Sequence, residues 1–438
     1  MAKYKAYPEY KDSGVEWLGE VPSHWNVAKT MRYFKIAMGQ TILKEQLEDD
    51  GEWPVYSATE GDSYFGYVSS PQVKLGVGDL VIPARGNSIG SVKLVSGKST
   101  TTQTTIYCKH LTQAIYPAFA YYFMLGNRKN LFWFTQTAIP QITVEEVGCN
   151  PILLPTYEEQ GVVASFLDHE TAKIDNLIEK QQQLIELLKE KRQAVISQAV
   201  TKGLNPDVPM KGSGVEWLGE VPEHWSLKSY RYACLIYRGK FGHRPRNDPS
   251  LYDGDYPFIQ TGDVARASKY IETYSQTLNE KGKAVSQLFP SGTLMMAIAA
   301  NIGDTAILGF EAYAPDSVVG FKPYQNLHLE FLRYSFMAAL PALEQTSTQS
   351  TQANLNIDRI GAVKAVFPPL DEQKNIIDYL DDMLCSYDLI KENANLAIQL
   401  LQERRTALIS AAVTGKIDVR DWVAPDSQDI EASQEATA

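Results

Sequence analysis

Three short patterns in this sequence contain residue types that could bind a phosphate, a dinucleotide or an extruded base. The tripeptide Gly97-Lys98-Ser99 matches the end of a phosphate-binding loop, but Val92 stands where its first glycine belongs. Gly76-Val77-Gly78 begins like a dinucleotide-binding loop, but Val81 replaces its last glycine. The segment 150–153, Asn-Pro-Ile-Leu, is similar to the Asn-Pro-Pro-aromatic loop of amino-methyltransferases but lacks the second proline and the stacking aromatic ring. We therefore predict no catalytic loop, and we interpret 150–153 as a linker.

Metal-dependent chemistry has no better support. The six histidines do not cluster with metal-ligand spacing, and the four cysteines are far apart with no CxxC pair. The ExK pattern of Glu9 and Lys11 occurs in nucleases, but no acidic residue is placed to complete a metal site. We predict no catalytic residue, no metal site and no cofactor bound by this chain, and we expect reduced thiols at Cys108, Cys149, Cys234 and Cys385.

The location that the sequence predicts is the cytoplasm. No run of about 18 apolar residues is present, so no segment is predicted to span a bilayer. The polar N-terminal segment 1–5 lacks the apolar stretch of a signal peptide. We therefore expect no membrane association.

The net charge of −11 argues against a simple nucleic-acid binder, which would usually be basic. The charge is unevenly distributed, however. Residues 26–150 carry 11 Lys and Arg against 10 Asp and Glu, and residues 226–364 carry 14 against 12, whereas 151–225 and 418–438 are acidic. Two near-neutral blocks therefore alternate with acidic segments, a balance that permits a basic face without showing one.

The sequence contains an internal duplication. Residues 13–25, SGVEWLGEVPSHW, recur as 213–225 with twelve of thirteen positions identical. Residues 154–204 align with 367–417 at a constant offset of 213, and the intervening blocks diverge. The duplicated His-Trp at the end of each motif could be a site that occurs twice. We favour a packing role, because Trp17, Leu18, Val21 and Trp25 supply an apolar patch.

The second repeat predicts two long helices, at about 157–201 and 370–414. Thr156 and Glu159 have the spacing of a capping box at the first helix start. Apolar residues then recur at coiled-coil spacing in both copies. We expect the two helices to pair antiparallel; separate surface helices on two domains are the alternative. The residues that we assign to the seam are Ile174, Leu177, Leu184 and Leu188 in the first helix and Leu384, Tyr387, Ile398 and Leu401 in the second.

The variable blocks show short β-rich runs, such as 80–82 and 92–95, and helical spacing at 116–132 and 327–343. The fold class that we predict is α+β, with two pseudo-twofold-related α/β domains separated by two long antiparallel helices that form a coiled-coil spacer. The predicted boundaries are 1–152 and 205–366 for the domains, 153–204 and 367–417 for the helices, and 418–438 for an acidic, disordered tail.

This layout resembles the specificity subunit of type I restriction–modification systems across essentially the whole chain. The residues that carry the resemblance are the doubled SGVEWLGEVPxHW motif, the Pro-x-x-x-Glu-Gln helix starts at 155–160 and 368–373, and the similar helix ends at 196–201 and 409–414. The resemblance implies two target-recognition domains, each reading one half of a bipartite double-stranded DNA site. It also implies that the helices set the spacing between half-sites and bind two modification subunits that methylate adenine.

The same resemblance implies that the cofactors belong to the partners. S-adenosylmethionine would be held by the modification subunits, and ATP and magnesium by restriction subunits that translocate and cleave DNA. Two other classes remain open at this point: a two-module adaptor without catalytic activity on a coiled coil, and a DNA methyltransferase with degenerate motifs. Binding of S-adenosylmethionine to the purified chain would favour the methyltransferase, and sequence-selective DNA protection by a reconstituted complex would exclude the adaptor.

Candidate DNA contacts are polar side chains suited to base edges or phosphates in the glycine-containing segments of the variable blocks. The stretch 238–246, with four basic residues in nine, is the strongest of them. The candidates are Arg85, Asn87, Ser88, Lys98, Thr102, Gln103 and Gln136 in the first block, and Arg238, Lys240, His243, Arg244, Arg246, Gln260, Thr261, Gln349 and Asn354 in the second.

Overall fold

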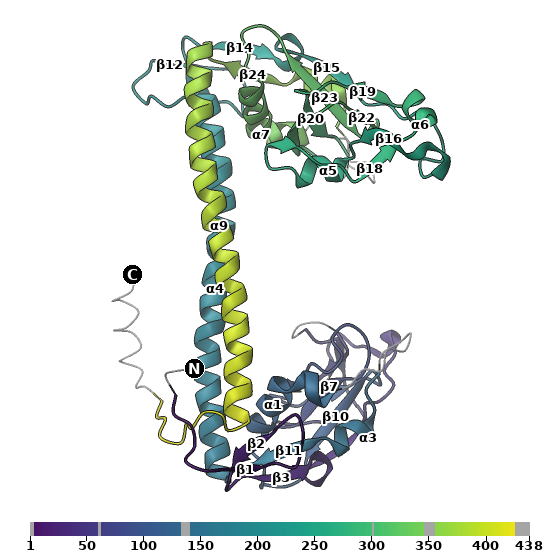
Figure 1. Ribbon diagram of the computed structural model, residues 1–438, viewed down its shortest axis with the longest axis vertical. Coiled ribbons are helices and arrows are strands. Elements are labelled where there is room, and N and C mark those ends of the chain that lie inside the picture. The colour runs from purple at the N-terminus through teal and green to yellow at the C-terminus, as the bar shows by residue number, and fades with distance from the viewer. Residues whose placement is uncertain (1–3, 60–62, 133–140, 300–301, 346–354, 425–438) are drawn as a thin grey trace. The chain divides into compact units, whose positions relative to one another are not determined.

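The computed structural model describes residues 4–59, 63–132, 141–299, 302–345 and 355–424. The chain divides into two compact units, the first made of 1–181 and 395–438 and the second of 182–394. Each unit combines one mixed α+β block with part of each of two long helices (Figure 1). The predicted α+β class with two long helices is confirmed.

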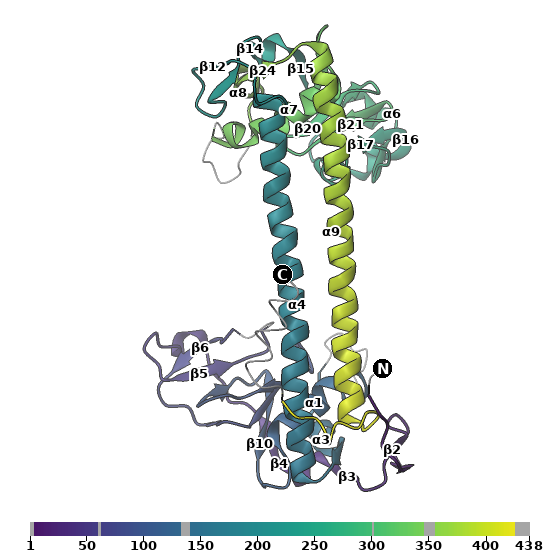
Figure 2. The same cartoon turned by 90° about the vertical axis from the view of Figure 1, so that its left-hand side faces the viewer.

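The two long helices are α4, Tyr157–Lys202, and α9, Leu370–Val413. In the first unit Arg405 of α9 forms two hydrogen bonds of 2.8 and 3.1 Å with the carboxylate of Asp175 on α4. In the second unit Arg192 of α4 contacts Asp388 of α9 at 2.9 Å. Later residues of α4 thus meet earlier residues of α9, so the helices pair antiparallel as predicted (Figure 2). Because each partner of one ion pair lies 213 residues from its counterpart in the other, the duplicated sequence builds the same contact twice.

The seam on α4 differs from the predicted one. Ile174 is buried, but Leu177 and Leu184 are 47% and 37% exposed. The partly buried positions are instead Ile178 and Ile185, with Leu188 as predicted. Both stripes have coiled-coil spacing, so spacing alone does not distinguish them. The structure buries the isoleucines more than the leucines that precede them. On α9 Leu384 and Tyr387 are buried and Ile398 and Leu401 are half-buried.

The start of each long helix is tied to the repeated motif. The Thr156 hydroxyl accepts a 3.3 Å hydrogen bond from the Glu159 amide, which is half of the predicted capping box. The Glu159 carboxylate does not return to the helix start; it accepts 3.0 Å and 2.9 Å bonds from Trp25 Nε1 and His24 Nε2. The prediction of a full capping box was therefore wrong, because the Glu159 carboxylate is already bonded to side chains of the repeated motif.

The second unit repeats this joint. Glu372 accepts a 3.0 Å bond from Trp225 Nε1 and lies 2.7 Å from His224 Nε2. In both units the neighbouring glutamine, Gln160 or Gln373, is fully buried and hydrogen-bonds to the chain before the helix. The duplicated His-Trp and Glu-Gln pairs are therefore the two sides of one structural joint.

The first unit adds a third donor to its joint. The Tyr7 hydroxyl donates a 2.8 Å hydrogen bond to Glu159. Burial raises the pKa of Tyr7, and the charge of Glu159 raises it further, so the hydroxyl stays protonated and remains a donor. The Glu159 side chain is 5% exposed, whereas that of Glu372, which lacks such a tyrosine, is 40% exposed.

The sheets of the first unit are small and mostly antiparallel. A four-stranded sheet has the order β4-β10-β7-β8, and a three-stranded sheet has the order β6-β5-β9, in which β5 and β9 are parallel. Strand β11 pairs with β3, so the segment 150–153 that we interpreted as a linker is part of a sheet. The strands are β1 Tyr10–Asp12, β2 Glu20–Pro22, β3 Asn26–Lys29, β4 Phe34–Met38, β5 Trp53–Tyr56, β6 Gly66–Val68, β7 Leu80–Pro83, β8 Lys93–Leu94, β9 Thr100–Thr101, β10 Thr105–His110 and β11 Pro151–Leu154.

The second unit has the same plan with longer sheets. Its sheets have the orders β15-β23-β20-β21-β17 and β18-β16-β22-β19, and β14 pairs with β24 as β3 does with β11. The strands are β12 Met210–Gly212, β13 Glu220–Pro222, β14 Ser226–Ser229, β15 Cys234–Arg238, β16 Tyr252–Phe258, β17 Tyr270–Ile271, β18 Gln276–Leu278, β19 Gln287–Phe289, β20 Leu294–Ala297, β21 Thr305–Leu308, β22 Ala312–Ala314, β23 Val318–Pro323 and β24 Lys364–Phe367.

Short helices cover these sheets. The predicted helix at 116–132 forms as two pieces that meet at Asn127, and the predicted helix at 327–343 forms as α7. The helices are α1 Pro117–Gly126, α2 Arg128–Leu131 and α3 Val144–Cys149 in the first unit, and α5 Thr261–Arg266, α6 Glu280–Ala284, α7 Leu329–Gln345 and α8 Ile357–Ala362 in the second.

The segment after α9 is packed, not disordered, at its start. Val419 is buried, the Trp422 ring lies 5.7 Å from that of Phe166, and the Asp418 amide donates to the Lys5 carbonyl at 2.7 Å. A disordered tail from 418 was therefore the wrong prediction for 418–422, because these apolar side chains bury against the first unit. Residues 425–438 lie outside the described part of the chain.

A tyrosine–aspartate bond fastens each block to its long helix. Tyr122 of α1 donates a 2.7 Å bond to Asp168 of α4, and Tyr334 of α7 donates to Asp381 of α9. Tyr122→Phe is expected to lower the free energy of unfolding by about 1–2 kcal/mol, because a bond to a charged acceptor is lost from a buried hydroxyl. Urea unfolding followed by circular dichroism measures this. Tyr157→Phe, at an exposed position of α4, is the control, and an equal loss in both variants would contradict the assignment.

Candidate nucleic-acid interface

The structure extends the internal repeat into the variable blocks. In the first unit β4 pairs antiparallel with β10, with Met38 opposite Ile106. In the second unit β15 pairs with β23 in the same way, with Arg238 opposite Val319. The first strands lie 200 residues apart in sequence and the second strands 213, so the insertion between them conceals this equivalence from a single alignment.

A glycine after each first strand lets the chain turn against the loop that precedes the second strand. A Cβ on Gly39 would lie 2.2 Å from the Thr102 carbonyl oxygen, and one on Gly239 would lie 1.9 Å from that of Pro315. Only glycine fits these contacts. The next residues hydrogen-bond in register: the Gln40 amide to the Thr101 carbonyl, and the Lys240 amide to the Ala314 carbonyl, both at 3.1 Å.

A third segment, which follows β5 in the first unit and β16 in the second, lies beside the loop that precedes β10 or β23. The Thr102 amide donates a 2.9 Å bond to the Tyr56 carbonyl, and the Ile259 amide donates a 2.8 Å bond to that of Tyr313. We call these three converging segments the loop edge. It comprises 39–41, 57–59 and 102–104 in the first unit, and 239–246, 260–261 and 315–317 in the second.

The basic stretch 238–246 forms much of the loop edge of the second unit. Arg238, Lys240, Arg244 and Arg246 are all exposed, so the structure brings these predicted residues to one surface. His243 is half-buried, and its Nε2 lies 3.0 Å from Asp248. Arg246 is held by the Asp316 carboxylate at 2.6 Å, and Nη1 of Arg244 donates 2.8 Å hydrogen bonds to the Phe241 and His243 carbonyls. Planar guanidinium groups presented in this way suit base edges and phosphates.

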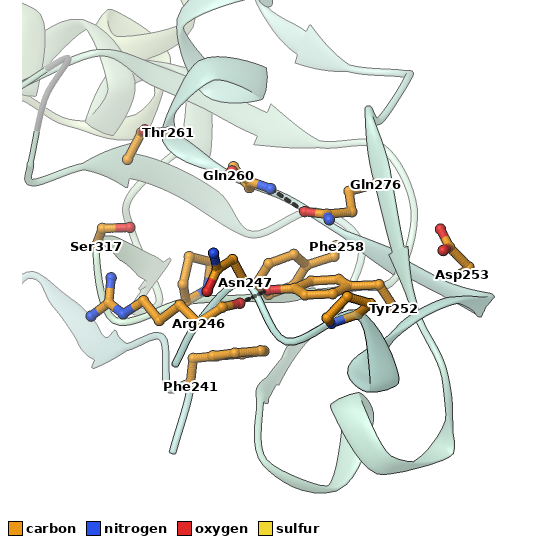
Figure 3. Close-up of a pocket in the computed structure, with 12 residues that line it drawn as sticks. Phe241, Arg246, Asn247, Tyr252, Asp253, Phe258, Gln260, Thr261, Gln276 and Ser317 are labelled. Carbon is orange, nitrogen blue, oxygen red and sulfur yellow. Dashed lines mark hydrogen bonds between the residues drawn. The ribbon is translucent and has the colours of Figure 1, made fainter. Parts of the chain in front are cut away.

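A pocket of about 480 Å³ lies beside this stretch in the second unit (Figure 3). Phe241, Tyr252 and Phe258 form an aromatic cluster on one side, and the side-chain amides of Gln260 and Gln276 hydrogen-bond to each other on the other. The predicted residues that meet here are Arg246, Gln260 and Thr261. Sequence reasoning missed Asn247, Tyr252, Gln276 and Ser317, which also line the pocket. No sequence pattern indicates Gln276, because it is the pairing of β18 with β16 that brings this residue to Gln260.

The loop edge of the first unit is polar but less basic. Gln103 is exposed, and the Thr41 hydroxyl donates a 2.7 Å bond to its side-chain oxygen. Arg85 and Asn87 are exposed on the segment after β7. Lys98 is exposed but lies 2.7 Å from the carboxylate of Glu52. These four residues remain available as DNA contacts.

Two predicted contacts of the first block are buried. Ser88 is 6% exposed, and its hydroxyl donates a 2.9 Å bond to the Ala58 carbonyl. Thr102 is 5% exposed, and its hydroxyl pairs with that of Thr104 at 2.8 Å. Both hydroxyls are buried and bond within the protein, so the structure does not present them at the surface as it does the other predicted contacts. Gln136, Gln349 and Asn354 lie outside the described residues.

The described ranges show neither a metal-ion cluster nor a membrane-spanning helix. Within them no group of three His, Cys, Asp or Glu side chains is arranged to hold a metal ion. No helix of this part of the chain is both long and apolar enough to cross a membrane.

The fold and the loop edges together define a class: two copies of one α+β module, each mounted on the same pair of antiparallel helices, with an equivalent polar edge on each. The family model described as "Type I restriction modification DNA specificity domain" matches residues 22–187 and 239–399. The chain belongs to this family. The two matches together cover most of the sequence and include one loop edge each.

Relatives of similar length support this assignment. The chain is 22% identical to the putative type I restriction enzyme MjaX specificity subunit of Methanocaldococcus jannaschii, over 92% of this chain and 96% of the relative. It is 20% identical to the type I restriction enzyme EcoDI specificity subunit of Escherichia coli, over 96% and 94%.

Two solved structures share the fold. One, from a study of complex assembly and conformational transition of the type I R-M system, has a TM-score of 0.71 at 15% identity and covers 90% of this chain and 98% of its own. The other, the HsdS subunit of Thermoanaerobacter tengcongensis, has a TM-score of 0.51 at 15% identity and covers 91% and 98%.

Proposed function

We propose that this chain is the DNA-recognition subunit of a type I restriction–modification complex and has no catalytic site of its own. Each unit reads one half of a bipartite DNA target through its loop edge. The observation that carries the proposal is the equivalence of the two edges, which share the glycine contact and the backbone bond after β4 and β15 but are lined by different side chains. Two such edges suit a target with two unlike half-sites.

The long helices are the proposed binding sites for modification subunits that methylate adenine. Several large apolar residues on them are exposed, among them Leu177 and Leu187 on α4 and Leu389, Leu396 and Leu400 on α9. Exposed apolar side chains along a helix favour burial against another protein. In this arrangement S-adenosylmethionine, ATP and magnesium belong to partner subunits, including the restriction subunits that translocate and cleave DNA.

The acidic net charge fits this division of labour. A protein that binds DNA alone derives much of its affinity from phosphate contacts. A subunit with a net charge of −11, in which the stretch 238–246 is the most basic part of the two loop edges, relies on its partners to enclose the duplex. The subunit's own side chains then contribute selectivity more than affinity.

Mapping of methylated adenines tests the proposal directly. A host that expresses this chain with its modification subunits should carry methyl groups at one bipartite sequence, and a host that expresses the modification subunits alone should not. Methylation that is absent, or that does not depend on this chain, would overturn the proposal. Methylation by the purified chain alone would show instead that it is a methyltransferase.

A further inference from the structure

Asp316 contacts several side chains of the basic stretch 238–246 in the second unit, and no sequence pattern had indicated these contacts. Its carboxylate oxygens Oδ2 and Oδ1 lie 2.7 and 2.6 Å from Nη2 of Arg246. Nη2 of Arg244 lies 3.7 Å from Oδ2. The Asp316 main-chain carbonyl also accepts a 2.8 Å hydrogen bond from Nε of Arg238. One residue thus contacts three of the four basic side chains between 238 and 246.

The exposed fractions of the side chains show that Asp316 is more buried than the two arginines that it contacts. The side chain of Asp316 is 29% exposed, whereas those of Arg244 and Arg246 are 58% and 48% exposed. The carboxylate is therefore less exposed than the two guanidinium groups, and Arg244 is also held by 2.8 Å bonds from its Nη1 to the Phe241 and His243 carbonyls. An exposed arginine without such a partner would sample many rotamers, and ordering it on DNA would cost conformational entropy.

The equivalent residue of the first unit is uncharged. Gln103 precedes β10 by the same number of residues as Asp316 precedes β23. Gln103 accepts a bond from Thr41, and no arginine follows β4 in the segment 39–46. Within the described residues the charged arrangement therefore belongs to the second unit, so the fold does not require an acidic residue at this turn.

We infer that Asp316 is a positioning residue for DNA selectivity: it holds Arg246 in place for base edges and offsets the charge of Arg244 and Arg246 toward phosphates. This inference rests on the proposed function. When the arginines are held, a wrong base cannot be accommodated by moving them. When their charge is partly neutralised, attraction to DNA of any sequence is weaker, so non-specific binding falls relative to specific binding.

Asp316→Asn in the reconstituted complex with modification subunits tests the inference. The asparagine retains the size of the side chain and removes the negative charge. We expect affinity for unrelated duplex DNA to rise severalfold and the salt dependence to steepen by about one phosphate contact. Discrimination against substitutions in the half-site of the second unit should fall about tenfold, as for partial loss of one bidentate base contact. Discrimination at the other half-site should not change.

Two further variants separate positioning from charge and from folding. Glu280→Gln removes the same charge from the same unit, at a carboxylate 3.2 Å from Lys283 on α6, and it should leave selectivity unchanged. Lys283 keeps its 2.9 Å bond to the Tyr256 hydroxyl in this variant. Asp316→Glu restores the charge and should recover the wild-type salt dependence. If Asp316→Asn does not fold, as thermal melting would show, Arg246→Lys should still lower selectivity, because lysine cannot bind a base bidentately.

The outcomes distinguish the inference from the function on which it rests. If the wild-type complex selects no bipartite target, the proposed function fails. If the wild-type complex is selective and Asp316→Asn alters neither the discrimination at the second half-site nor the salt dependence, the positioning role of Asp316 is refuted. A loss of discrimination at the other half-site would refute it as well.

Discussion

Replacement of residues 30–150 by the corresponding block of a related specificity subunit is expected to change one half of the recognised DNA sequence and leave the other half intact. Every contact that builds the first loop edge lies between 39 and 104, within that block. The junctions preserve the pairing of β3 with β11 and the joint at Glu159, so the new block is held on the same frame. Methylation at the original target should fall by roughly a hundredfold or more, since each mismatched base pair costs about 1–3 kcal/mol.

The matched exchange in the second unit is residues 230–363, between β14 and β24. It should alter the other half of the target. Methylome sequencing of hosts that carry each exchange measures both effects. A single exchange that changed both half-sites would show that the two units do not read DNA independently.

The second large effect concerns stability. Trp25→Ala is expected to lower the free energy of unfolding by about 3–5 kcal/mol, because the indole is completely buried and its removal leaves a cavity. The Glu159 carboxylate, itself buried, also loses the 3.0 Å bond from Nε1. Urea unfolding followed by circular dichroism measures the loss. The expected cost exceeds that at Trp17, which the sequence singled out together with Trp25 but which is only partly buried.

Two comparisons make this prediction specific. Trp225→Ala should cost less, because the side chain of Glu372 is 40% exposed and water can replace the lost donor. Trp25→Phe retains most of the packing and should cost about 1–3 kcal/mol through the lost hydrogen bond to a charged group. A folded Trp25 variant with altered DNA selectivity would contradict the structural role of the motif.

The frame of this protein could be predicted from its sequence because its signals are local or repeated. The doubled 13–25 motif and the paired 154–204 and 367–417 segments indicated two modules and two long helices. The periodic apolar residues indicated that the helices pair. Those signals depend on spacing along one chain segment, and the structure shows the predicted helices with nearly the predicted ends.

The details of the site could not be predicted, because they depend on contacts between segments that are distant in the sequence and share no pattern. The seam passes through Ile178 and Ile185, which are partly buried, and not through Leu177 and Leu184, which are exposed, although both pairs have the same spacing. Ser88 and Thr102 have residue types suited to base contact, but burial directs their hydroxyls inward.

Hydrogen-bond and ion-pair partners that lie far apart in the sequence were the hardest to predict. Glu159 was predicted to cap its own helix, and it binds Trp25 and His24 instead. Asp316 lies 70 residues from Arg246 along the chain. Sequence patterns report local spacing, whereas hydrogen bonds and ion pairs between loops depend on which strands pair and in what register. Spacing along the chain was therefore enough to predict the duplicated architecture and the resemblance to the family, whereas strand pairing between distant segments places the side chains of the loop edges and the groups that hold them.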